Sequence, residues 1–177
     1  MRWRLSSSSD PVALAIVDGT GKHAGAGPHY SRRTPGSKTF TGVGREIVLV
    51  TDDENAVWAV VYQRTPSRRG TGRSRGREGM TDARPRYVWR NMMFRRLGGP
   101  LASELIASAL ERTYEEWARR YGSLPAERLR TEIEIGRVAS SNPGYCYKVA
   151  GWTVDRIVRG KLYLWAPERP VALEAAA

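Results

Sequence analysis

The stretch PRYVWRNMMFRRLGGPLASELIASALERTYEEWARRYG, residues 85–122, contains the transition on which the fold depends. Its first ten residues are rich in aromatic and apolar side chains, which favours a strand. From Leu101 onward the apolar side chains recur at intervals of three and four, which predicts a long amphipathic helix over residues 101–121. Pro100 suits the first turn of that helix and Gly122 suits its end. The stretch therefore predicts a strand, a glycine turn and a helix in succession.

Further strands are expected on both sides of this stretch. The runs EIVLVT and AVWAVVYQ, residues 46–51 and 56–63, flank a polar turn and predict a pair of strands. Residues 131–135 alternate, with Ile133 and Ile135 on one face and Glu132 and Glu134 on the other. We also expect strands at residues 12–17, 145–154 and 161–165, and a turn or short helix entry at residues 140–144. This order predicts a protein of the α/β (α+β) class, a sheet with helices packed on its faces.

Length and composition favour a single domain over residues 1–177. The 177 residues are 41% apolar and 27% charged, the balance of a globular protein with one core. We expect flexible ends at residues 1–10 and 171–177, and a long irregular segment over residues 20–44. The sequence offers neither a convincing signal peptide nor an apolar run of membrane-spanning length, and its single cysteine, Cys146, cannot form an intrachain disulfide. A cytoplasmic location without membrane contact is therefore expected.

The formal net charge of +11 indicates a polyanionic partner. A basic loop is predicted at residues 67–80, within which the arginines are Arg68, Arg69, Arg73, Arg75 and Arg77. Such a loop can follow a phosphate backbone, because guanidinium groups bind phosphate in a planar, bidentate way and also stack on bases. We therefore expect these arginines to bind DNA. The alternative is a solvated loop on a surface whose charge serves solubility.

The glycine turn before the helix is a candidate anion site. Amide groups at a helix start have no partner within the helix, and the dipole there is positive. Gly98 and Gly99 let a phosphate approach those amides, and Arg95 or Arg96 can add charge-assisted hydrogen bonds. Ser103 can supply a hydroxyl to the same anion. The alternative is a tight turn that merely joins a strand to a helix.

The segment Arg95-x-x-Gly98-Gly99-Pro100 resembles the Q/R-x-x-G-x-G/A turn on which GNAT acyltransferases hold the pyrophosphate of acyl-CoA. The first four positions match, whereas Pro100 departs from the pattern and removes one amide donor. Downstream, Asn142 and the run from Tyr147 to Gly151-Trp152 resemble the Asn and the Y-x-x-x-G-F/W pattern of the same family. The resemblance covers roughly residues 46–165 and implies a GNAT-like fold, a mixed and mostly antiparallel sheet flanked by helices. It also implies that acetyl-CoA or a related acyl-CoA is bound by Arg95, Arg96, Gly98, Gly99, Ser103 and Asn142.

A second resemblance, to Mom-type proteins of phages, rests on residues 142–147 with Ala150-Gly151 and on the pair His29-Tyr30. Mom-type proteins are GNAT-like enzymes that alter adenine in phage DNA by adding a carbamoylmethyl group. The resemblance implies a transferase acting on the exocyclic amine of adenine in DNA, in the cytoplasm of a phage-infected bacterium. Iron enters by this resemblance alone. The two histidines, His23 and His29, cannot build a multi-histidine metal site, which leaves a mixed site with tyrosine or carboxylate ligands as the alternative.

The candidate catalytic residues are His29, Tyr30, Glu132 and Tyr145. His29 titrates near neutrality and can manage the proton of an amine, and Tyr30 can be the acid for a thiolate leaving group. Glu132, or its neighbour Glu134, can be a general base; the alternative is that these side chains merely face solvent. A base taken out of the DNA stack needs aromatic rings to hold it, and the available rings are Tyr30, Tyr145, Tyr147 and Trp152, with core packing as the alternative for the last two. Cys146 is expected to be a small packed hydrophobe.

Two other functions remain open. The first is a GNAT N-acetyltransferase that acts on a small amine or a protein, and the second is a non-catalytic DNA-binding protein on a GNAT scaffold. An acceptor cleft lined by acidic residues would favour the first, and a blocked glycine turn would favour the second. A wide cleft with arginines on its rim would favour DNA modification.

Overall fold

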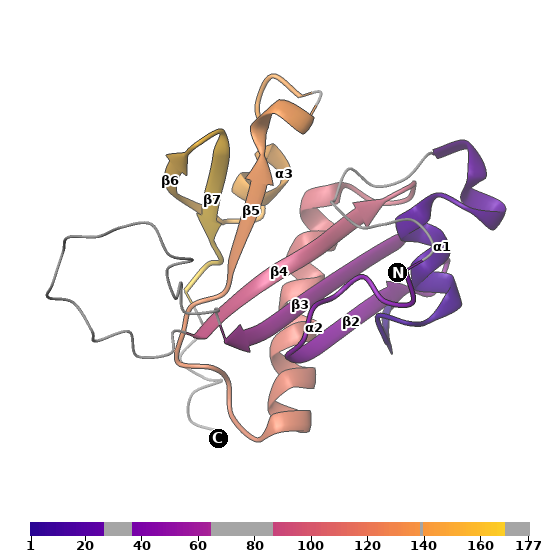
Figure 1. Cartoon of the computed structure of the whole chain (residues 1–177), viewed down its shortest axis with the longest axis horizontal. Helices are drawn as coiled ribbons and strands as arrows, with labels where there is room; N and C mark the ends of the chain where they lie inside the picture. Colours follow the sequence, from indigo (N-terminus) through magenta and orange to yellow (C-terminus); the bar gives the residue numbers. More distant parts are fainter. Residues whose placement is uncertain (27–36, 65–86, 139, 169–177) are drawn as a thin grey trace, which may run out of the picture.

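The computed structural model describes residues 1–26, 37–64, 87–138 and 140–168, which form a seven-stranded sheet with helices on its faces (Figure 1). In chain order the elements are β1 (Trp3–Ser6), α1 (Pro11–Asp18), the 3-10 helix η1 (Gly21–Ala26), β2 (Arg45–Thr51), β3 (Ala56–Arg64), β4 (Tyr87–Arg96), α2 (Ala102–Tyr121), β5 (Arg130–Glu134), the 3-10 helix η2 (Ile135–Arg137), α3 (Tyr145–Val149), β6 (Thr153–Val158) and β7 (Lys161–Trp165).

The strands lie in the order β1-β2-β3-β4-β5-β7-β6, and each neighbouring pair is antiparallel except β4 and β5. Parallel neighbours need a crossover connection, and α2 supplies it between β4 and β5. The predicted class, a mixed and mostly antiparallel sheet flanked by helices, is therefore confirmed. Within the described residues, the helices lack the length and apolar character that crossing a membrane requires.

The central strands are buried on both faces. In β3, Trp58 and Val60 belong to the core beneath α2 and α3, whereas Val57 and Ala59 pack toward α1 on the opposite face. A strand covered on both sides reads as a continuous apolar run, which is why the sequence predicted β2 and β3 correctly. The strand β4 and the helix α2 are confirmed as well, although α2 begins at Ala102 after Leu101 as its N-cap, and Pro100 lies before its first turn.

The N-terminal predictions were wrong. Residues 12–17, predicted as a strand, lie in the helix α1, because Asp10 accepts a hydrogen bond from the Val12 amide at 2.9 Å and Pro11 occupies the first helical position. Gly19, with φ of 66°, ends that helix. Part of the segment expected to be flexible is the edge strand β1, in which Trp3 pairs with Thr51.

The strand predicted at residues 145–154 was also wrong. Residues 145–149 form the helix α3, and β6 begins only at Thr153. The helix starts at Gly144, whose φ of 75° suits glycine, and a Cβ there would lie 3.0 Å from Ile133 and 3.1 Å from Leu162. The turn at residues 140–144 and the strand at residues 161–165 are as predicted. The predicted basic loop, residues 67–80, and residues 171–177 lie outside the described ranges.

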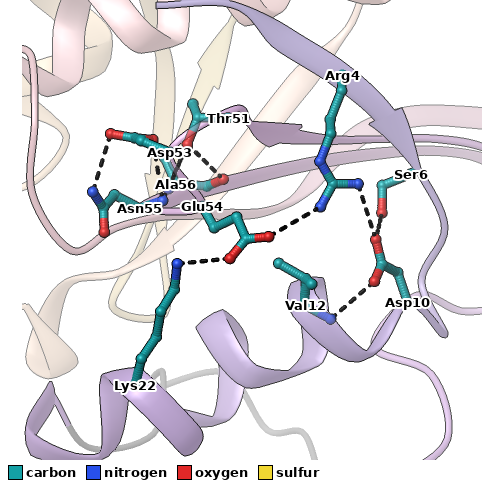
Figure 2. Close-up of polar contacts among 10 residues, drawn as sticks. All are labelled: Arg4, Ser6, Asp10, Val12, Lys22, Thr51, Asp53, Glu54, Asn55 and Ala56. Carbon is teal, nitrogen blue, oxygen red and sulfur yellow. Dashed lines mark hydrogen bonds and ion pairs between the residues drawn. The ribbon is translucent and has the colours of Figure 1, made fainter.

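Charged side chains join the N-terminal elements to the turn between β2 and β3 (Figure 2). Arg4 of β1 contacts Asp10 at 3.4 Å and Glu54 at 3.9 Å, and Lys22 of η1 contacts Glu54 at 2.6 Å. Ser6 donates a hydrogen bond to the Asp10 carboxylate. The pKa of Asp10 is lowered because, although burial opposes ionisation, the bonds from Ser6, Val12 and Arg4 outweigh it. Asp10 thus stabilises both the start of α1 and its attachment to β1.

We expect Asp10→Ala to lower the free energy of unfolding by about 1 kcal/mol at pH 7, since it removes a helix cap. Because the folded pKa of Asp10 lies below its ordinary value of 3.8, this contribution is complete above that value and is lost as the pH falls through the folded pKa. Urea unfolding followed by circular dichroism should therefore show a smaller difference between the two proteins at pH 3 than at pH 7. An equal difference at both pH values would contradict the assignment; Asp10→Asn, an uncharged cap, is the control for the charge.

Candidate functional site

The sheet splits where β4 and β5 diverge. The two parallel strands pair at Arg90 with Arg130 and at Asn91 with Thr131, and beyond these positions β5 leaves β4 at an angle (Figure 1). A cavity of about 270 Å³ opens at this split, between β4, β5 and α3. Its polar lining includes Arg90, Asn91, Thr131, Glu132, Glu134 and Tyr147. A concave site with a few convergent polar groups is the form that small-molecule sites take.

A β-bulge in β4 shapes one wall of the cavity. Ala59 of β3 pairs with Met93, and the next residue, Val60, pairs with Asn91, so that Met92 is an extra residue without a partner in this ladder. The Asn91 side chain holds the bulge in place, because its Nδ2 donates to the carbonyl oxygens of Ala59 and Met93, both at 2.9 Å. The backbone of β4 is therefore irregular at the point where it faces the cavity.

The hydroxyl of Tyr147 belongs to a buried polar group in the cavity wall. Tyr147 Oη donates to Asn91 Oδ1 at 2.7 Å, and Thr131 Oγ1 contacts the same oxygen at 3.4 Å. All three residues are buried, with Tyr147 only 6% exposed. The predicted catalytic Tyr145 is 60% exposed and is not among the residues that line the cavity. Because residues 145–149 form the helix α3, the side chain of Tyr147 points inward. The strand predicted from the sequence did not indicate this orientation.

Both acidic residues predicted on β5 line the cavity, and both have cationic partners. Glu132 forms an ion pair with Lys161 of β7. Glu134 contacts Arg137 at 2.7 Å. The structure thus brings the predicted base Glu132 to the site, but the negative charge of this wall is balanced by neighbouring cations.

Two arginines lie side by side at the edge of the cavity. Arg90 lines it, and Arg130 is the register partner of Arg90 on the neighbouring strand. Burial lowers the pKa of Arg90, the carboxylate of Glu132 acts against that shift and the charge of Arg130 adds to it. Among the described residues neither arginine forms an ion pair, and Arg90 Nε is buried without a hydrogen-bond partner. Two adjacent guanidinium groups without ion-pair partners among the described residues favour the binding of an anion.

The glycine turn before α2 differs from the expected phosphate cradle. Arg95 is buried on the other face of the sheet, where its Nη1 donates to the Val17 carbonyl at 2.7 Å, and burial lowers its pKa. Arg96 does lie at the turn and donates to the Gly99 carbonyl at 3.1 Å. Pro100 has no N–H group, and the Leu101 amide donates to the Glu104 carboxylate at 3.2 Å. The turn therefore offers a diphosphate fewer amides than the sequence suggested.

The other predicted acyl-CoA residues are divided between the turn and the surface. A Cβ at Gly98 would meet open space, whereas at Gly99 it would lie 3.6 Å from the carboxylate of Asp53. Ser103 is half-buried in the first turn of α2. Asn142 is exposed, accepts a hydrogen bond from Lys148 Nζ at 2.7 Å, and is not among the residues that line the cavity. The predicted set is therefore not assembled around a single anion.

No family model, curated protein or solved structure matches this chain.

Several predicted residues fall outside the described ranges, and their roles stay predictions. They are His29, Tyr30, Arg68, Arg69, Arg73, Arg75 and Arg77. Among the described residues, there is no group of three or more His, Cys, Asp or Glu side chains that could hold a metal ion. Cys146 lines the cavity and packs partly against the core, and burial raises the pKa of its thiol, which keeps it protonated.

Proposed function

We propose that this protein is a DNA-modifying transferase of the GNAT type, which places a group from an acyl-CoA or related donor on the exocyclic amine of adenine, as in Mom-type phage enzymes. The observation that carries the proposal is the cavity at the split between β4 and β5, with the Tyr147 hydroxyl in its wall and Arg90 at its edge. The order of a fourth strand, a glycine turn and a long helix agrees with the resemblance of the sequence to GNAT enzymes.

The cavity suits the reactive end of an acyl-CoA better than the turn suits its diphosphate. Met92 and Phe94 of β4 and Ile133 of β5 supply apolar walls. At the turn, Arg96 and Gly98 remain as phosphate contacts, whereas Glu104 occupies one amide. An acyl-CoA supplies an activated group on a thioester. The residues that would hold the acyl-CoA are therefore those of the β4 and β5 walls at its reactive end and Arg96 at its diphosphate.

The residues of the cavity can perform acid–base work. The Tyr147 hydroxyl donates to Asn91 Oδ1 in this structure. To protonate the thiolate that leaves the donor, it has to exchange that hydrogen bond for one to the thiolate sulfur. The carboxylate of Glu132 can accept a proton from the attacking amine while Lys161 keeps it oriented. A proton donor and a proton acceptor in one cavity are what transfer to an amine requires.

The charge around the cavity favours DNA as the acceptor. Glu132 and Glu134 are paired with Lys161 and Arg137, so that the wall carries little net negative charge for a cationic amine. Arg90 and Arg130 add positive charge at the edge, and the whole chain has a formal net charge of +11. The alternative, an N-acetyltransferase acting on a small amine, is supported by the presence of the two carboxylates in the wall.

We expect Tyr147→Phe to reduce the modification of DNA about a hundredfold, since it removes the proton at Oη but keeps the buried ring. The measurement is mass spectrometry of nucleosides from DNA of cells that make the protein, with a new adenosine-derived mass as the signal. Tyr121→Phe is the matched control, because Tyr121 also donates one hydrogen bond, to the Glu46 carbonyl at 3.1 Å, and does not line the cavity.

Unaltered nucleosides in cells that make the folded wild-type protein would contradict the proposed function. If a purified sample instead acetylates small amines from acetyl-CoA, the alternative function is the correct one. Equal modification by wild type and Tyr147→Phe would remove Tyr147 from the mechanism while leaving the transferase proposal intact.

A further inference from the structure

One face of the sheet formed by β5, β7 and β6 is not covered by any helix of the described residues. Ile133, Leu162 and Leu164 point to the other face, where they are buried beneath α3. The helix α1 packs against β2, β3 and Met93. The uncovered surface, called here the open face, includes the residues that the strand register places on one side: Arg130, Glu132, Glu134, Arg156, Lys161, Tyr163 and Trp165.

The open face combines aromatic rings with guanidinium groups. Arg156 on β6 lies 5.4 Å from the centre of the Tyr163 ring, and Arg130 on β5 lies 5.9 Å from it. Trp165 is the register partner of Arg130 and is partly exposed. Arginine beside an aromatic ring gives two kinds of planar surface on which a nucleic-acid base can stack.

The positive charge of the open face is only partly balanced. Lys161 is paired with Glu132, and Arg156 has Asp155 at 3.6 Å. Arg130 and its neighbour Arg90 form no ion pair among the described residues. Such a pair of cations beside aromatic rings matches the alternation of phosphates and bases in a nucleic-acid strand.

The open face adjoins the cavity. Glu132 belongs to the open face and also lines the cavity. Arg90, which lines the cavity as well, is the register partner of Arg130 on the open face. A nucleic-acid strand lying across β6, β7 and β5 would therefore run toward the cavity at the β4–β5 split. Nucleotides bound there would be delivered to the reacting groups.

We propose that the open face binds an unpaired stretch of DNA, with bases stacked on Tyr163 and the guanidinium of Arg156, and phosphates on Arg90 and Arg130. The inference rests on the proposed function for its choice of DNA. Unpaired nucleotides are the fitting ligand because base faces are accessible only outside a duplex, in which neighbouring bases cover them. An enzyme acting on a base taken out of the stack gains from such a platform beside its cavity.

The test is fluorescence anisotropy with a labelled, mixed-sequence single-stranded DNA of about 16 nucleotides, and with the corresponding duplex and RNA. We expect Tyr163→Ser to weaken single-strand binding roughly tenfold, and Tyr163→Phe, which keeps the ring, to leave it almost unchanged. The double variant Arg130→Gln/Arg156→Gln removes one phosphate contact, that of Arg130, and one stacking group. It should therefore reduce the slope of log affinity against log salt concentration by about 0.7, the contribution of one phosphate contact on a single strand.

The control for charge is Arg2→Gln/Arg120→Gln, which removes two positive charges from exposed positions away from the open face. Circular dichroism checks that each variant is folded. The proposal is overturned if the control weakens binding as much as the Arg130/Arg156 variant, if duplex binds and single strands do not, or if RNA binds more tightly than DNA. In the first two of these outcomes DNA binding survives, and with it the proposed function; absence of all DNA binding would contradict both.

Discussion

Trp58→Ala is expected to lower the free energy of unfolding by about 3–5 kcal/mol. The Trp58 side chain has no exposed surface and lies at the centre of the core beneath α2 and α3. Its ring centre is 6.1 Å from that of Phe94, 6.3 Å from that of Trp152 and 6.5 Å from that of Tyr147. Its Nε1 donates to Thr113 Oγ1 at 2.9 Å. The substitution therefore leaves a large cavity and also removes a buried hydrogen bond.

Guanidinium chloride unfolding followed by circular dichroism measures this loss. Thr113→Val separates the two contributions, because it removes the acceptor with little change in volume and should cost about 1–2 kcal/mol. Trp3→Ala is the control for the loss of an indole group at the periphery, since Trp3 is only partly buried on the edge strand β1. A loss of less than about 1 kcal/mol for Trp58→Ala would contradict the central place of this ring in the core.

The sequence correctly predicted the elements in which the pattern of buried and exposed positions is regular along the whole element. Residues 47–50 of β2 and 56–61 of β3 are apolar and buried because both faces of the sheet are covered there, and α2 keeps its apolar stripe for its whole length. Residues 12–17 are a short apolar run, and such a run does not distinguish a buried strand from a buried helix. The cap residues Asp10 and Gly19 did contain that information.

The predicted anion site at the glycine turn lacks Arg95, because of a backbone irregularity that cannot be recognised in the sequence. In a regular strand, Arg95 would share a face with Trp89, beneath α2. The bulge at Met92 reverses the alternation, so that Phe94 joins Trp89 in the core beneath α2 and Arg95 joins Met93 on the α1 side. Arg95 is thus moved away from the helix start by one extra residue, held by hydrogen bonds that span β3 and β4.

The same bulge leads to the second large expected effect. Asn91→Asp should lower the free energy of unfolding at pH 7 by more than about 3 kcal/mol. Asn91 is 6% exposed, and its Nδ2 donates to two carbonyl oxygens. A carboxylate would place an oxygen where that donor was, facing the carbonyl oxygens of Ala59 and Met93. Burial and these carbonyl dipoles both disfavour the charged form, so the folded pKa of the introduced carboxyl should lie above its unfolded value of about 4.

The sign of the pH dependence follows from this raised pKa. Between the unfolded and the folded pKa the native state binds more protons, so the stability of Asn91→Asp relative to wild type should fall as the pH rises from about 4 toward the folded pKa. Urea unfolding of both proteins at pH 5 and pH 8 measures the difference. Asn142→Asp is the matched control, because Asn142 is exposed beside Lys148, and its change should stay within about 0.5 kcal/mol. If Asn91→Asp behaves like this control, or shows a pH-independent loss, the Asn91 amide does not hold the bulge, and the orientation of Tyr147 Oη in the cavity loses its support.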